Sequence, residues 1–243
     1  MNELYWIGLI FFLAGFTQGV SGFGSALVAM PLLLFFIDVK TAVPLCMLNG
    51  LAITLILSFQ LRAQIDWKKI MPLFFGCLPG IVMGTLFLKG ANNNVMKFLL
   101  GFLLLGYSTY ALAFSPKARK MGKVWPVLAG FFTGVIGSAF SAGGPPTIIY
   151  TTLTGWKKDE IKATLSVFFF LTGILMAAAH ALSGLTTMVV VNYLKVSVFF
   201  VTGGVIAGSI CYGRISQKAY IRLIFGLLIV MGCMMVVTAF PLS

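Results

Sequence analysis

Acidic residues and histidine are scarce in this sequence, and their scarcity excludes several kinds of function. Among 243 residues there are five Asp or Glu and a single histidine, His180. Neither a Ser/His/Asp triad nor an HExxH zinc site can be assembled from so few candidates. We therefore predict that the protein is not an enzyme, and that it uses no metal ion and no cofactor.

Long polar stretches are also missing. Hydrophobic residues make up 60% of the chain and charged residues 9%, with a mean hydropathy of +1.04, which is typical of a membrane protein with several spans. The longest polar interruption, about 115–123, is too short for a nucleotide-binding domain, so any driving force must come from a gradient. The net charge of +12 falls in loops, where it orients helices in the bilayer, and we expect no nucleic-acid partner.

The positions of the five carboxylates and four cysteines bear on the charge of the substrate and on metal binding. Cation-coupled carriers usually place Asp or Glu within a span, because a charge there is costly and is kept for function. The carboxylates here, Glu3, Asp38, Asp66, Asp159 and Glu160, all map to loops or ends of apolar runs. A cationic substrate and a buried proton relay are disfavoured, whereas anion flow down a gradient, or coupling through a protonated substrate, stays open. The cysteines lack CxxC spacing and are interpreted as packing residues.

One segment occurs twice in the chain. Residues 13–31 (LAGFTQGVSGFGSALVAMP) and 128–146 (LAGFFTGVIGSAFSAGGPP) are 115 residues apart and agree at eight of nineteen positions without a gap. A weaker match pairs 79–85 (PGIVMGT) with 203–209 (GGVIAGS). We predict a first repeat at 1–115, a basic cytoplasmic loop at 116–123 and a second repeat at 124–243.

The apolar runs predict the topology. There are eight, at approximately 5–37, 41–61, 70–88, 95–114, 124–155, 161–182, 188–212 and 221–240. The first and fifth have 33 and 32 residues, more than the ~20 needed for one crossing and fewer than the ~40 needed for two. We predict that 5–37 and 124–155 are re-entrant hairpins with limbs of about 15 residues, and that the other six runs are full spans.

The loop charges favour this topology. A hairpin returns the chain to its starting side, so two hairpins change which loops share a side of the membrane. With the N-terminus outside, 13 of the 17 Lys and Arg then lie in cytoplasmic loops, as the positive-inside rule expects. Eight single crossings would divide the same charges 9 to 8. Each half thus has one hairpin and three spans, which predicts an inverted repeat with both termini outside.

The Gly-rich tips suit an anion. The second limb of a hairpin begins with unbonded N–H groups, where the helix dipole favours negative charge. Glycine lets these groups reach a ligand, and Ser and Thr add neutral donors. The predicted substrate-binding residues are Gln18, Gly19, Ser21, Gly22, Ser25, Asn49, Thr133, Gly134, Gly137, Ser138, Ser141, Gly143, Gly144 and Pro145. The alternative is that these residues only form tight helix turns.

Other residues remain open between two roles. His180 could be a proton-linked group or a structural histidine. Thr54, Gln60 and Thr172, like Asn49, could line the path or bond neighbouring backbone carbonyls. The Gly-x-x-x-Gly pairs, such as Gly15/Gly19, Gly80/Gly84, Gly130/Gly134 and Gly204/Gly208, are expected to allow close helix packing.

The two Gly-rich segments also carry a resemblance. GFTQGVSGFGSALVAMPLL and GFFTGVIGSAFSAGGPP, in a chain of this length, resemble the sulfite exporter TauE/SafE family of membrane permeases, and the similarity covers nearly the whole chain. The resemblance implies a transporter with inverted repeats for small sulfur-containing anions, organosulfonates or related carboxylates. It also implies that the two Gly-rich segments form the site.

These observations lead to one expectation with an alternative. We expect an all-α, multi-pass inner-membrane protein that exports sulfite, organosulfonates or similar anions by alternating access between its two repeats. A passive small-anion channel is the alternative. It would use the same helix dipoles, but its two halves would not switch between two conformations. The predicted partners are the small anion and the lipid bilayer, and the sequence leaves the oligomeric state open.

Overall fold

The computed structural model describes residues 2–114, 121–212 and 217–239, and within these ranges the regular elements are helices. Most of the predicted basic loop at 116–123 lies outside the described residues. The helices are α1 (Asn2–Ser21), α2 (Ser25–Leu33), α3 (Val39–Gln60), the short 3-10 helix η1 (Arg62–Gln64), α4 (Trp67–Gly90), α5 (Asn93–Ala113), α6 (Val124–Phe140), α7 (Gly144–Leu153), α8 (Lys158–Leu182), α9 (Met188–Cys211) and α10 (Gln217–Ala239).

The helix lengths confirm an all-α polytopic membrane protein. Seven helices of the described chain are long and apolar enough to cross a membrane. Six of them, α3, α4, α5, α8, α9 and α10, correspond to the six predicted spans. The seventh is α1, the first limb of the first predicted hairpin. Its segment Glu3–Ser21 is long and apolar enough to cross a membrane by itself.

Both predicted hairpin segments are broken helices, but their limbs are unequal. α1 has 20 residues and α2 has 9, while α6 has 17 and α7 has 10, so the expectation of two limbs of about 15 residues is wrong. The glycines in the first limbs do not interrupt them. The helices stop only where the backbone turns left-handed, at Gly22 and Gly24 with φ of 86° and 93°, and at Ser141 with φ of 56°.

The second break falls one helical turn later than the alignment of the repeats predicts. That alignment pairs Gly22 with Gly137, but Gly137 lies inside α6 and the helix ends at Phe140. Measured from the breaks, Gly22 corresponds to Ser141, since each is the first residue after its helix. Both breaks therefore have three residues between the limbs, although they differ in register by four residues.

The carboxylates lie at helix ends, as predicted. Asp38 and Asp66 are the N-cap residues of α3 and α4, and their side chains accept hydrogen bonds from the N–H groups of Thr41 and Lys68. Glu3 lies in the first turn of α1, and Asp159 and Glu160 lie in the first turn of α8. Such caps bond N–H groups that a helix leaves unpaired at its start, and negative charge is favourable there.

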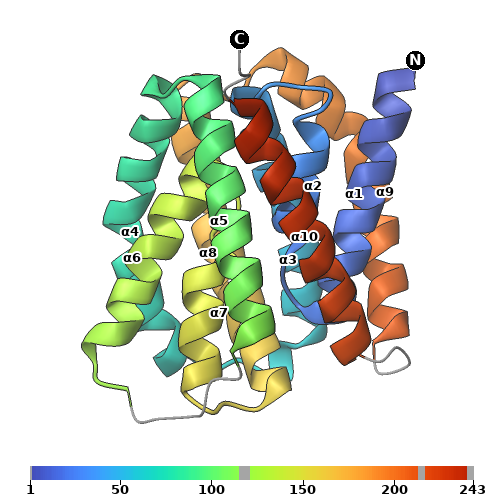
Figure 1. The fold of residues 1–243 in the computed structure, drawn as a ribbon. Coiled ribbons are helices and arrows are strands. Elements are labelled where there is room, and N and C mark those ends of the chain that lie inside the picture. The colour runs from blue at the N-terminus through green and yellow to red at the C-terminus, as the bar shows by residue number, and fades with distance from the viewer. Residues whose placement is uncertain (1, 115–120, 213–216, 240–243) are drawn as a thin grey trace.

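The helices of the two halves pair crosswise. α1 packs against α9 and α6 packs against α4, and these are the two most extensive helix contacts in the molecule. α3 packs against α8, and α5 against α10. Exchanging α1–α5 with α6–α10 turns the α1–α9 pair into the α6–α4 pair and leaves the α3–α8 and α5–α10 pairs as they are. In Figure 1, α1 begins and α10 ends at the same end of the bundle, whereas α6 enters from the opposite end.

Glycines make the two largest interfaces possible. A Cβ added to Gly80 would lie 2.3 Å from the carbonyl oxygen of Phe131, and one added to Gly208 would lie 2.3 Å from that of Phe16. This close backbone approach confirms that the Gly-x-x-x-Gly pairs pack helices. It also corrects the weaker sequence match, because the contacts make Gly208 equivalent to Gly80, whereas the aligned segments pair Gly208 with Gly84.

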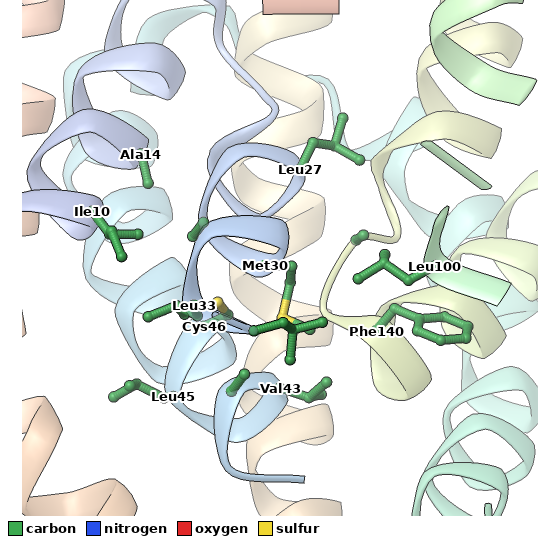
Figure 2. Packing of buried hydrophobic residues seen from close by; sticks show 14 of the residues in the cluster. Ile10, Ala14, Leu27, Met30, Leu33, Val43, Leu45, Cys46, Leu100 and Phe140 are labelled. Carbon is green, nitrogen blue, oxygen red and sulfur yellow. The ribbon is translucent and has the colours of Figure 1, made fainter. Parts of the chain in front are cut away.

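The short helix α2 is enclosed by the rest of the bundle. Seven of its nine residues are buried. Figure 2 shows Leu27, Met30 and Leu33 of α2 among side chains from neighbouring helices, including Cys46, Leu100 and Phe140. Burial of this apolar face anchors the second limb, so the start of α2 has a fixed position inside the molecule.

Candidate functional site

A cavity lies between the two helix breaks. It contains about 650 Å³ of empty space including its opening. Its walls come from both breaks and from the middle of α3 and α8, and the lining residues are Gln18, Gly24, Ser25, Ala26, Leu27, Cys46, Met47, Gly50, Leu51, Thr54, Thr133, Gly137, Ser141, Ala142, Gly143, Gly144, Phe169, Thr172, Gly173 and Met176. None of these residues carries a formal charge.

Two helix N-termini meet at this cavity. The first residues of α2 and α7, Ser25 and Gly144, both line it. The N-cap residues are Gly24 and Gly143, which have no side chain to bond a free N–H group of the first turn, and in α7 fewer of these groups are present because Pro145 and Pro146 carry none. Two helix dipoles thus present their positive ends to one enclosed space, which favours an anion.

The first hairpin supplies an oriented amide. Gln18, on the last turn of α1, is 4% exposed and lines the cavity. Its Oε1 accepts a hydrogen bond from the hydroxyl of Ser25 at the start of α2. Because the oxygen of the amide is occupied in this way, its NH₂ group is the part available to a ligand. The bond also ties the two limbs of the hairpin together.

The second hairpin is closed by hydroxyl groups instead. Thr133 lines the cavity, and its Oγ1 lies 3.3 Å from Oγ1 of Thr147 on α7. Oγ1 of Thr147 in turn donates to the carbonyl oxygen of Gly144 at 3.1 Å. Both threonine side chains are buried. Each half therefore has a side-chain hydrogen bond between the two limbs of its hairpin, an amide with a hydroxyl in one and two hydroxyls in the other.

Ser141 is the one described residue other than glycine with a positive φ. A left-handed backbone costs a residue with a Cβ about 1–2 kcal/mol. Gly22, the corresponding residue of the first break, meets the same requirement without that cost. Ser141 lines the cavity, so the strained position brings a hydroxyl group to its wall.

Seven of the fourteen predicted residues line the cavity together, namely Gln18, Ser25, Thr133, Gly137, Ser141, Gly143 and Gly144. The others lie elsewhere. Gly19 and Gly134 pack against the backbones of α9 and α4, and Ser21 bonds the carbonyl oxygens of Thr17 and Phe23. Gly22 contacts the side chain of Lys162.

Three more predicted residues are buried outside the cavity wall. Nδ2 of Asn49 donates to Oγ of Ser197 at 2.9 Å and to the carbonyl oxygen of Leu45 at 3.0 Å. Ser138 bonds the carbonyl oxygen of Gly134 within α6, and Pro145 is buried in the first turn of α7. Asn49 thus links α3 to α9.

Most of the cavity wall formed by α3 and α8 is not among the residues predicted from the sequence. Thr54 and Thr172 line the cavity and also bond backbone carbonyls of their own helices. Gln60 is exposed at the end of α3. Cys46, interpreted as a packing residue, forms part of the wall, as does Phe169. These residues lie in continuous apolar helices, where no local signal separates a cavity wall from a packing face.

The fold and the cavity define a class of protein. A multi-pass bundle whose two broken helices start at a common internal cavity is the arrangement of a membrane transporter. Comparison with known proteins gives the family. Residues 7–235 match the family model for the sulfite exporter TauE/SafE, and the chain belongs to this family.

One relative and the solved structures complete the comparison. The chain is 26% identical over 230 residues to a protein of Cupriavidus necator named as a probable sulfite/organosulfonate exporter TauE, and the match covers 92% of this chain and 90% of that protein. The similarity therefore spans both halves. A search of the solved structures finds no match to this chain.

Proposed function

We propose that the protein exports sulfite, organosulfonates or similar small sulfur-containing anions, and that it binds them in the cavity between the two breaks. The observation that carries this proposal is that α2 and α7 both begin at one uncharged cavity. Such a site attracts an anion through dipoles and N–H donors, without a fixed cation that would hold the anion too tightly for release. The sulfur chemistry is supported by the family and by the name of the relative.

The transport cycle that fits this fold is alternating access. The crosswise pairing of α1 with α9 and of α6 with α4 gives two similar units around a shared site, as in carriers built from repeats. A passive channel would use the same cavity without a change between two states. Counterflow in proteoliposomes distinguishes them, since saturable exchange of labelled for unlabelled anion supports a carrier and non-saturating flux supports a channel.

Anion binding is expected to stabilise the purified protein selectively. Sulfite, thiosulfate or an organosulfonate such as sulfoacetate or taurine at about 100 times its Kd should raise the Tm by about 5 °C or more, because a ligand of the native state stabilises it. Sulfate, acetate and chloride serve as comparison anions. The proposal fails if sulfite, thiosulfate and the organosulfonates all leave the Tm unchanged. It also fails if chloride and acetate raise the Tm as much as these compounds do.

We further propose that the protein lies in the inner membrane with both termini outside. In Figure 1, α1 begins and α10 ends at the same end of the bundle, which supports placing both termini on one side of the membrane. An impermeant amine reagent added to intact cells should then modify Lys195, which is exposed near the start of α9, and leave Lys123, which is exposed at the start of α6. Labelling of Lys123 before lysis, with Lys195 protected, would reverse the orientation.

A further inference from the structure

Both breaks leave backbone carbonyls that need donors. The last carbonyls of a helix have no partner within it, and α1 and α6 end inside the bundle, where no bulk water replaces the missing donors. These C-terminal ends also carry the negative pole of the helix dipole. They lie beside a cavity that, by the proposed function, holds an anion, so their negative charge works against binding unless it is compensated.

Lys162 bonds the end of the first limb of the first hairpin. Its Nζ donates to the carbonyl oxygen of Gly19 at 2.9 Å. Nζ also lies 4.0 Å from the ring centroid of Tyr212, where an ammonium group is favoured. The lysine is 7% exposed, and a Cβ on Gly22 would lie 2.7 Å from its Cγ. The aliphatic part of the side chain therefore fills the space beside the break.

His180 makes the corresponding contact at the second hairpin. Its Nε2 donates to the carbonyl oxygen of Ser138 at 2.8 Å, and the ring is completely buried. Since a carbonyl oxygen can only accept a hydrogen bond, Nε2 is the ring nitrogen that carries the proton of this bond. Gly19 and Ser138 occupy the same place in their hairpins, because each lies two residues before the end of the first limb and six before the start of the second.

Both donors belong to one face of α8. Lys162 and His180 are 18 residues apart, which is five turns and about 27 Å along an α-helix. Phe169, Gly173 and Met176 lie between them on the same face, at positions +7, +11 and +14 from Lys162, and all three line the cavity. One face of α8 thus contacts the first break, forms a wall of the cavity and contacts the second break.

We propose that Lys162 and His180 are positioning residues for the transported anion. Each holds the last turn of a first limb against α8, and so fixes where the second limb begins, while its N–H group offsets the negative end of the first limb. α8 therefore determines the separation of the two helix N-termini that face the anion. This inference rests on the proposed function for its ligand, but its structural part concerns the two breaks alone.

Affinity measurements test the proposal with the full chain. Lys162→Met should weaken binding of sulfite and methanesulfonate about tenfold, as should His180→Phe, because each loses a buried hydrogen bond at the site. Lys162→Arg and His180→Gln keep a donor and should stay within about threefold of the unchanged protein. KM in proteoliposomes should rise with Kd, while the maximal rate changes less. Thr164→Val is the matched control, since Thr164 is buried on α8 and its hydroxyl has no hydrogen-bond partner among the described residues.

The outcomes separate this inference from the proposed function. A purely structural role would lower the Tm of Lys162→Met and His180→Phe with unchanged affinity in the folded fraction, and that result would overturn the inference alone. If the unchanged protein binds no anion, the proposed function fails. Hydrogen exchange then tests whether Lys162 and His180 hold the two breaks in place. Lys162→Met should then speed amide exchange in 17–24 only, and His180→Phe in 136–143 only, whereas equal exchange everywhere overturns the inference. If Lys162→Met does not fold, Lys162→Leu, which also lacks a donor, takes its place.

Discussion

Alanine in place of Gly80 or Gly208 is expected to destabilise the protein by about 3 kcal/mol or more. The added methyl group would lie 2.3 Å from a backbone carbonyl oxygen in both cases, and a backbone cannot move aside as a side chain can. The helices of the α4–α6 or α1–α9 pair would have to separate along their whole contact. The Tm and the yield of monodisperse protein in detergent measure the effect.

A glycine of another helix supplies the control. A Cβ on Gly106 in α5 would meet nothing within 4 Å, so Gly106→Ala should leave the Tm unchanged or raise it slightly, because alanine favours a helix. The equivalence of the two interfaces adds a stricter requirement, since Gly80→Ala and Gly208→Ala should cost similar amounts. Normal yield and Tm for either variant would contradict the close packing described here.

Replacing Gln18 by glutamate is expected to abolish anion binding, with at least about a hundredfold loss of affinity. The substitution keeps the shape of the side chain and an oxygen for the Ser25 hydroxyl, but it exchanges the NH₂ donor for a second oxygen. A carboxylate some 4 Å from a bound anion repels it by about 4 kcal/mol at an effective dielectric constant of 20. Titration of the Tm with an organosulfonate measures the change in affinity.

Gln60→Glu adds the same charge without touching the cavity, because Gln60 is exposed at the end of α3. It should bind the anion like the unchanged protein. Gln18→Met removes the donor without adding charge and should give an intermediate loss of about tenfold. If Gln18→Glu binds as tightly as the unchanged protein, Gln18 does not contact the anion.

The sequence predicts the broken helices but not the place of each break. Gly15, Gly19, Gly130 and Gly134 look like breaking residues in the repeated segment, yet all lie within helices, where they pack against the backbone of a partner helix. A glycine that permits close packing and a glycine that permits a turn are the same letter in a sequence. The distinction depends on the neighbouring helix, which sequence periodicity does not reveal.

Seven of the predicted residues line the cavity, but much of its wall is not among them. Residues at the breaks, such as Ser25 and Gly143, could be chosen from local sequence because N–H groups at a helix start follow from the break itself. Nothing in the local sequence marks Lys162 as a neighbour of the first break, and only the tertiary fold brings its side chain to the carbonyl oxygen of Gly19. The walls from α3 and α8 likewise depend on contacts between distant parts of the chain.

The crosswise pairing has a consequence for biosynthesis. Gly15 of α1 packs on Val201 of α9, so the first helix to enter the membrane waits while 185 intervening residues are made. During that time the glycine faces of both α1 and α4 are open to lipid, because their partners belong to the second half. A single half cannot bury these faces within itself. Each half therefore needs the other before its glycine faces are covered.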